Sequence, residues 1–138
     1  MINPKSEYRN PKQYQITKSQ NPKQYDLENR TLEFARQVRN FIKKLPKTIG
    51  NIEDSKQVVR SSGSIGANYI EANESLSKKD FQMRIKISRK EAKETAYWLQ
   101  LVDINSNKES DDERLGLLKE ATELMLIFGS IIQKTNNV

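Results

Sequence analysis

Residues 60–75 read RSSGSIGANYIEANES, and the interpretation of this stretch decides the fold class. Two glycines three residues apart, several serines and a leading arginine suit a loop that cradles phosphate. However, a Walker loop requires G-x-x-x-x-G-K-[ST], and the stretch has neither that spacing nor the lysine. A dinucleotide-binding G-x-G-x-x-G follows a strand, and the preceding residues show no strand-like alternation. A phosphate loop is therefore disfavoured.

An apolar stripe at helical spacing runs straight through the same stretch. Its members lie three or four residues apart and are Val58, Ser62, Ile65, Tyr69 and either Ala72 or Asn73. A glycine in a helix interior costs about 1 kcal/mol relative to alanine, and close packing of a neighbouring helix would offset that cost. The sequence therefore predicts a helix in which the small residues around Gly63 and Gly66 let another helix approach.

Three further windows show the same periodicity, and none shows sustained strand alternation. With this stretch they predict helices over residues 26–45, 53–74, 78–105 and 111–134. Pro46 ends the first helix, while Ser77 and Ser110 are predicted to cap the third and fourth helices. Four helices of roughly 20 residues with short connections predict an all-α, antiparallel up-down four-helix bundle.

The first 25 residues differ from the rest in composition. The sequence NPKQY begins at Asn10 and again at Asn21, and a further NPK begins at Asn3. Asn-Pro favours turns, and these repeats have too few aliphatic residues to build a core. We therefore expect a flexible N-terminal arm over residues 1–25, followed by the bundle over residues 26–138. The arm carries a net charge of +4 out of +6 for the chain, which indicates either an anionic partner or a solubilising role.

The composition disfavours several functional classes. The chain has no cysteine and no histidine, so it lacks disulfides, a thiolate nucleophile and the commonest general base and transition-metal ligand. Its sequence has no apolar run near the roughly 20 residues of a membrane span and no apolar signal core at the start. We expect a cytoplasmic, non-enzymatic protein without a cofactor or membrane contact.

Carboxylate pairs at a spacing of three residues occur at Glu71/Glu74, Glu91/Glu94 and Glu120/Glu123. Di-iron bundles use Glu-x-x-His on two helices, and this chain has no histidine. A carboxylate-only magnesium or manganese site stays open as an alternative, although we predict no metal. The favoured interpretation gives a structural role in helix register to Asn68, Glu71, Glu91 and Glu94.

One face of the predicted helix over residues 78–105 is strongly basic. At about 100° per residue, one arc of roughly 120° contains Lys78, Lys79, Lys86, Arg89, Lys90 and Lys93. A row of cations on a rigid helix could follow a phosphate backbone, which makes this arc the candidate nucleic-acid site. A solvated charged face without a ligand is the alternative.

The same helix carries apolar residues between the basic arc and the core stripe. These residues are Met83, Ile87, Trp98 and Leu101. The last predicted helix also has more apolar positions than one face can bury. Such a surplus favours a homo-oligomer or a protein partner, and we assign these four residues to that interface.

Two segments together resemble a known family. RSSGSIGANYIEANESLSKKDF, beginning at Arg60, and RIKISRKEAKETAYWLQLV, beginning at Arg84, resemble the four-helix-bundle proteins of the bacterial 23S rRNA intervening-sequence family. The matching positions are Arg60, Ser62, Ser64, Ile65, Ala67, Asn68, Ile70 and Glu71, then Phe81, Ile85, Glu91, Glu94 and Leu99.

The resemblance implies an up-down bundle. Members are similar to accessory proteins of diversity-generating retroelements, which form pentameric rings and bind RNA and a reverse transcriptase, so a pentamer is the favoured assembly. Two hypotheses stay open: an oligomer that associates with RNA or other nucleic acid through the basic face, and a protein scaffold without nucleic-acid contact.

Overall fold

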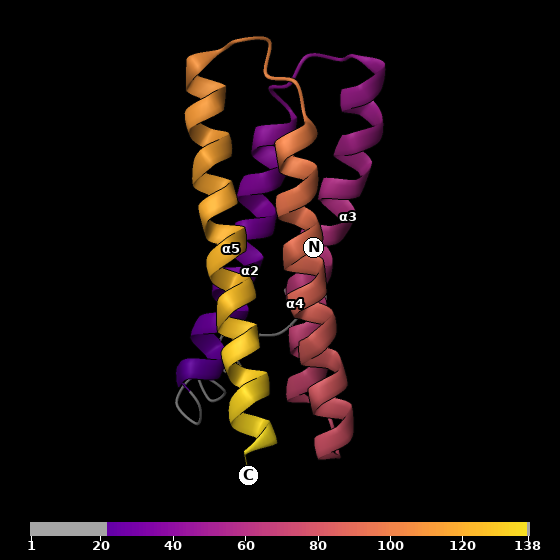
Figure 1. The fold of residues 1–138 in the computed structure, drawn as a ribbon, viewed down its shortest axis with the longest axis vertical. Coiled ribbons are helices and arrows are strands. Elements are labelled where there is room, and N and C mark those ends of the chain that lie inside the picture. Colours follow the sequence, from indigo (N-terminus) through magenta and orange to yellow (C-terminus); the bar gives the residue numbers. More distant parts are fainter. Residues whose placement is uncertain (1–21, 138) are drawn as a thin grey trace, which may run out of the picture. The chain divides into compact units, whose positions relative to one another are not determined.

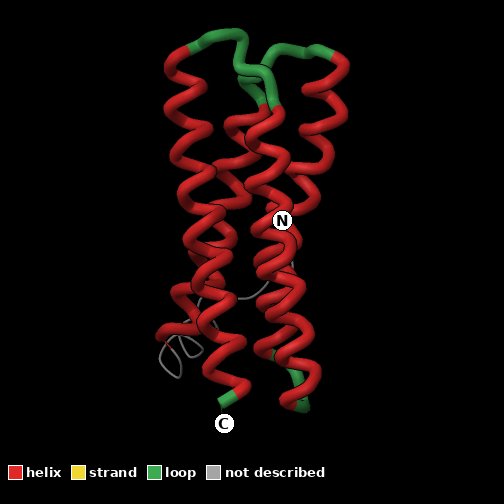
Figure 2. The backbone as a smooth tube through the Cα atoms, in the orientation of Figure 1, coloured by secondary structure: helices red, strands yellow, loops and turns green. Residues whose placement is uncertain are grey.

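The computed structural model describes residues 22–137, which form four α-helices without a strand (Figure 1). In chain order they are α2 (Pro22–Ile42), α3 (Ile49–Asn73), α4 (Lys78–Leu101) and α5 (Lys108–Asn136). Figure 2 shows that short loops connect them. The all-α prediction is confirmed. Of the predicted arm, residues 1–21 lie outside the described residues.

From Thr31 onward the chain forms one compact unit, and residues 22–30, the first turns of α2, belong to a separate one. Within the larger unit α4 packs against both α3 and α5. Gln82, near the start of α4, donates to Oδ1 of Asn136 at the end of α5 at 2.7 Å. Arg114, near the start of α5, donates to the carbonyl oxygen of Val102 just after α4 at 3.0 Å. These contacts fix the antiparallel order.

The predicted apolar stripes form the core. From Thr31 onward, the largest fully buried side chains include Phe34 and Phe41 of α2, Ile65 of α3, Ile85 and Leu99 of α4, and Leu124 and Phe128 of α5. The Tyr69 ring packs against the Phe128 ring with centroids 5.6 Å apart. Each such side chain contributes roughly 1.5–3 kcal/mol through removal of its apolar surface from water. The core therefore holds all four helices in the bundle.

The stretch 60–75 is helical, as predicted. Gly63 and Gly66 both lie inside α3. A Cβ atom on Gly66 would stand 2.7 Å from Oγ1 of Thr31 in α2, which is too close for a real contact. Gly66 therefore permits the close approach of a neighbouring helix that the sequence predicts, and in the structure that helix is α2.

The limits of α2 differ from the predicted range of 26–45. The helix begins at Pro22, inside the second NPKQY repeat, and proline suits the first helical position because its missing N–H has no helical partner there. The chain leaves α-helical geometry after Ile42, where Leu45 donates to the Ile42 carbonyl three residues back at 3.2 Å. Leu45 is nevertheless buried, so the apolar stripe continues beyond the end of the helix.

Helices α3 and α5 begin earlier than predicted because other residues cap them. The Thr48 side chain accepts from the Asn51 N–H at 3.1 Å, which starts α3 at Ile49. Asn107, and not Ser110, caps α5, because the Asn107 side chain accepts from the Ser110 N–H at 2.8 Å. The predicted Ser77 cap of α4 is confirmed by a bond of 3.1 Å from the Asp80 N–H.

Helix α4 ends at Leu101, four residues before the predicted end at 105. Val102 is extended, and both Asn105 and Ser106 have positive φ values, 56° and 58°, which interrupt helical geometry. The polar connection therefore starts earlier than its composition suggests.

Asn51 joins the two loops at one end of the bundle and is only 3% exposed. Its Nδ2 donates to the carbonyl oxygens of Pro46 at 2.9 Å and Asp103 at 2.8 Å. Its Oδ1 accepts from the N–H of Asp103 at 2.8 Å. This Asn51 bridge ties the α2–α3 loop to the α4–α5 loop.

In the described part of the chain, every helix is too short or too polar to cross a membrane.

Candidate nucleic-acid interface

Two buried polar contacts orient α4 against α3 and so decide which of its faces reaches solvent. Ser88 Oγ donates to the Ile65 carbonyl oxygen at 2.9 Å. The hydroxyl oxygens of Ser61 and Thr95 lie 2.7 Å apart. Because buried polar groups need partners, these bonds disfavour rotation of α4 about its axis. The opposite, basic face is thereby held outward.

Three of the four predicted register residues take part in ion pairs and hydrogen bonds between α3 and α4. Arg60 of α3 reaches Oε1 of Glu91 and Oε1 of Glu94, each at 3.3 Å. Arg84 donates to Oδ1 of Asn68 at 3.0 Å, and Asn68 donates to the Ser64 carbonyl oxygen at 2.9 Å.

The fourth residue, Glu71, is exposed, and its carbonyl oxygen accepts from Ser75 Oγ at 3.2 Å. Asn68, Glu91 and Glu94 therefore join α3 to α4, whereas this Glu71 bond stays at the end of α3.

All six predicted cations of α4 are exposed. Within residues 22–137, no ion pair or side-chain hydrogen bond engages Lys79, Lys86, Arg89, Lys90 or Lys93. Lys78 has an interaction of its own. Other exposed cations are paired, such as Lys44 with Glu113 at 3.0 Å and Lys108 with Asp112 at 3.2 Å. The α4 face therefore carries five cations whose charge is not offset by a bonded acid.

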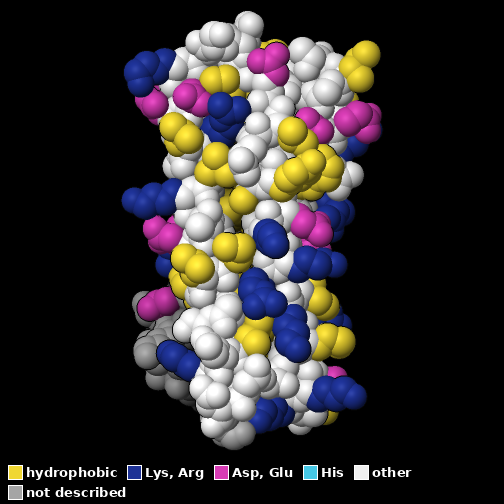
Figure 3. Space-filling view, viewed as in Figure 1, with side chains coloured by type: hydrophobic (Ala, Val, Ile, Leu, Met, Phe, Trp, Pro, Cys, Tyr) yellow, Lys and Arg dark blue, Asp and Glu magenta, His cyan; other side chains and the backbone are white. Residues whose placement is uncertain are grey.

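Four of these cations border a groove of about 950 Å³ between α4 and α5, which we call the basic groove. Its α4 side consists of Lys86, Arg89, Lys90 and Lys93, and its α5 side includes Met125, Leu126, Gly129 and Ile132. Figure 3 shows dark-blue side chains over α4 with hydrophobic side chains beside them. Lys78 and Lys79 lie outside the groove, in the first turn of α4.

Gly129 has no side chain and so leaves space on the α5 side of the groove. A Cβ atom on Gly129 would stand 3.7 Å from Cδ of Arg89, an ordinary contact distance. The aliphatic stem of Arg89 therefore runs close to the α5 backbone while its side chain remains exposed. This placement follows the usual behaviour of arginine, which lays its stem on protein surface and keeps its head in water.

The predicted interface residues differ in exposure. Met83 is 50% and Leu101 49% exposed, whereas Ile87 and Trp98 are half-buried. Helix α5 adds exposed Leu115 and Leu126. Trp98 lines a second groove, between α3 and α4, together with Gln57, Glu94 and Tyr97.

The chemistry of this face is that of anion binding. Guanidinium and ammonium groups attract phosphate, and the neighbouring apolar surface offers contact area to a non-polar group. The Glu91 and Glu94 carboxylates converge on Arg60, and the described residues contain no group of three or more acidic side chains able to hold a metal ion.

Sequence reasoning did not find the α5 side of the basic groove. Periodicity identified surplus apolar residues on α5 but could not show that Met125 and Leu126 stand opposite the α4 cations. It also left out Tyr97, which is 56% exposed beside Lys90 and Lys93. The sequence does contain a signal for it: Tyr97 follows Lys93 by four positions on one helix, a spacing that places the two side chains side by side.

Comparison with known proteins places the chain in a family. A crystal structure of a protein of unknown function from the S23 ribosomal protein family of Bacteroides thetaiotaomicron VPI-5482 is similar, with 35% sequence identity and a TM-score of 0.65. The similarity covers 76% of this chain and 96% of that one. No curated protein matches. The family model described as 23S rRNA-intervening sequence protein matches residues 23–128. The chain therefore belongs to the 23S rRNA-intervening sequence protein family.

Proposed function

We propose that this chain is a non-enzymatic, oligomeric helical-bundle protein that binds RNA or another nucleic acid through the basic face of α4. The observation that carries the proposal is the set of five exposed cations without a bonded acid: Lys79, Lys86, Arg89, Lys90 and Lys93. Neutralised phosphates release counterions, so such a set supplies affinity without any base contact. The family name, which refers to 23S rRNA intervening sequences, supports a nucleic-acid partner.

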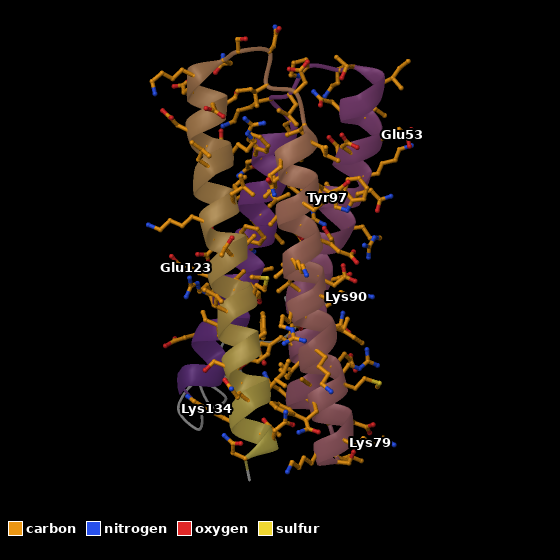
Figure 4. The ribbon with its side chains drawn as sticks, viewed as in Figure 1. Glu53, Lys79, Lys90, Tyr97, Glu123 and Lys134 are labelled. Atoms are coloured by element: carbon orange, nitrogen blue, oxygen red, sulfur yellow. The ribbon has the colours of Figure 1, made fainter. Side chains whose placement is uncertain are left out.

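The rigidity of α4 supports the same function. The bonds from Ser88 and Thr95 to α3 hold the helix so that Lys86, Lys90 and Lys93 project on one side. Cations on a fixed helix lose less conformational freedom on binding than cations on a loop. Figure 4 shows Lys79, Lys90 and Tyr97 in this order along α4.

The test measures RNA affinity as a function of salt concentration. The logarithm of the association constant should fall linearly with the logarithm of salt concentration, with a slope of about −0.7 per neutralised phosphate of a single strand. The triple variant Lys86→Gln, Lys90→Gln, Lys93→Gln should reduce that slope by about 2 units if each lysine contacts one phosphate.

The matched control is Lys43→Gln, Lys47→Gln, Lys119→Gln. These lysines are exposed and lie outside the basic groove, so the control makes the same change in net charge. It should bind RNA with nearly the slope of the unaltered chain. If both variants lost the same amount of slope, the effect would come from the net charge of the protein and not from the basic groove. Absent or salt-independent binding would contradict the proposal.

The exposed apolar side chains support self-association. Met83, Leu101, Leu115 and Leu126 are each between 49% and 63% exposed. A pentamer is the favoured state because the resemblance to ring-forming accessory proteins points to it. Light scattering of the purified protein measures the subunit number.

A protein scaffold is the second candidate, because the exposed apolar side chains of α4 and α5 could equally contact a different protein. Capture of one stoichiometric protein that survives nuclease treatment, together with absent RNA binding, would favour the scaffold.

A further inference from the structure

Tyr97 is the feature of α4 that phosphate binding alone does not use. Its ring is 56% exposed and packs against the Trp98 ring in an edge-to-face contact, with centroids 5.1 Å apart and planes at 77°. The half-buried Trp98 therefore restrains an aromatic ring whose surface lies largely in water. A restrained, exposed ring is suited to stacking on another flat group.

Two cations connect this ring to the basic groove. Lys90 and Lys93 border the basic groove and also the second groove, of about 490 Å³, which contains Tyr97 and Trp98. Lys93 precedes Tyr97 by four residues, so the two side chains are neighbours on one helix face. Lys90 precedes it by seven residues, or about 10 Å along the helix. The cations and the ring therefore form one surface.

The acid on this surface is already bonded. Glu94 lines the second groove, and Arg60 lies 3.3 Å from its Oε1. The guanidinium of Arg60 also contacts Glu91, which is largely buried. Because one guanidinium is shared by two carboxylates, this cluster keeps one negative charge, and the two charges of Lys90 and Lys93 leave the surface beside Tyr97 with a net positive charge.

Cations beside an exposed aromatic ring select between two forms of nucleic acid. In a duplex the base faces are stacked on one another, so a duplex would use the lysines only. In a single strand the base faces are accessible, and proteins that bind such strands combine a basic groove with aromatic rings. A ring next to the lysines adds affinity for the single strand alone.

We propose that the α4 face is a site for single-stranded nucleic acid, in which phosphates contact Lys90 and Lys93 and a base stacks on Tyr97. This inference rests on the proposed function and specifies the form of nucleic acid bound. The lysines bind the strand through charge, and the ring distinguishes a strand with accessible bases from a duplex or a bare phosphate backbone.

The experiment compares three ligands of equal length by fluorescence anisotropy: single-stranded oligoadenylate, the same strand in a duplex, and an abasic strand. RNA and DNA versions of each separate the two sugar types. The unaltered protein should bind oligoadenylate most tightly. Base–aromatic stacking is worth 1–3 kcal/mol, so Tyr97→Ala should weaken that binding roughly 5- to 150-fold and leave the abasic strand unaffected.

Two controls test the role of the ring. Tyr97→Phe keeps an aromatic face and should retain nearly full affinity. Ile52→Ala removes an exposed apolar side chain of α3 outside both grooves and should leave affinity unchanged. Trp98 is the only tryptophan of the chain, so a change in its fluorescence on binding reports occupancy beside Tyr97.

The outcomes separate this inference from the proposed function. Equal affinity for all three ligands, with no effect of Tyr97→Ala, would overturn the single-strand site while phosphate binding stands. Binding detected by anisotropy without any change in Trp98 fluorescence would place the ligand elsewhere and also overturn it. Absent binding of every ligand would refute both proposals.

Discussion

The Thr31 side chain occupies the space that a Cβ atom on Gly66 would need. Its Oγ1 lies 2.7 Å, and its Cβ 3.1 Å, from the ideal Cβ position. Both residues are buried, at a point where α3 lies against α2. The glycine in the middle of α3 is therefore explained by packing, which agrees with the helical interpretation of residues 60–75.

Gly66→Ala is expected to destabilise the bundle. Overpacking costs about 1–3 kcal/mol, and the higher helix propensity of alanine returns only about 1 kcal/mol. We expect a net loss of up to about 2 kcal/mol in the free energy of unfolding, measured by urea denaturation followed by circular dichroism.

Gly63→Ala is the matched control for that change. The atom nearest to its added Cβ would be Nη2 of Arg39 at 3.5 Å, an ordinary contact distance. This variant should be as stable as the unaltered chain or more stable by up to about 1 kcal/mol. Equal effects of the two substitutions would contradict a specific role for Gly66.

Asn51→Ala is expected to weaken the end of the bundle where two loops meet. The change removes two donated bonds and one accepted bond, and leaves the Pro46 and Asp103 backbone groups without these partners. Each unsatisfied group costs about 1–3 kcal/mol when buried, and these are partly buried, so we expect a total near 2–3 kcal/mol.

Asn107→Ala provides the comparison, because Asn107 caps α5 with a single side-chain bond. Loss of such a cap costs about 1 kcal/mol. Hydrogen exchange of the Asp103 amide should increase in the Asn51 variant and not in the Asn107 variant. If Asn51→Ala destabilised the protein no more than Asn107→Ala, the bridge would be unimportant.

The Ser61–Thr95 pair is expected to show energetic coupling. Each hydroxyl also bonds a backbone carbonyl of its own helix, Ser61 that of Val58 at 3.4 Å and Thr95 that of Glu91 at 2.8 Å, so removal of either one deletes the bond that joins α3 to α4. Ser61→Ala and Thr95→Val should each cost about 1–2 kcal/mol, and the double variant should cost less than the sum. Additive losses in a double-mutant cycle would show that the pair does not act as a unit.

The exposed apolar residues of α4 are expected to control self-association. Met83→Ser with Leu101→Ser should lower the mass measured by light scattering, because the variant loses apolar area at the predicted interface. The control is Ile49→Ser with Leu76→Ser. These two side chains are more exposed than Met83 and Leu101, and they lie at the start of α3 and in the loop after it. A mass that falls only in the control would place the interface elsewhere.

Periodicity predicted the packing of the core because local spacing determines which side chains share a helix face. The stripe residues Ile65, Ile85 and Leu99 are fully buried, and the polar stripe members Ser62, Ser88 and Thr95 are buried with them. The boundaries of the helices were predicted less well. Thr48 and Asn107 were not identified as caps, because several residues near each helix start could serve and the backbone decides among them.

The site was predicted from one helix only. The wheel of α4 grouped the cations correctly on an exposed face, whereas their second wall belongs to α5, more than 30 residues later in the sequence. Asn51 escaped prediction for a similar reason, since it bonds to Asp103, 52 residues away. Spacing within a helix carries no information about such partners.

The position of Lys90 and Lys93 between two grooves has a thermodynamic consequence. Both side chains line both grooves, so a ligand that held them in one groove would change the free energy with which the other groove takes a ligand. Linkage requires the change to be reciprocal: whatever factor the first ligand imposes on the second, the second imposes on the first. The shared wall of two lysines would thus couple the two grooves directly, without any movement of the backbone.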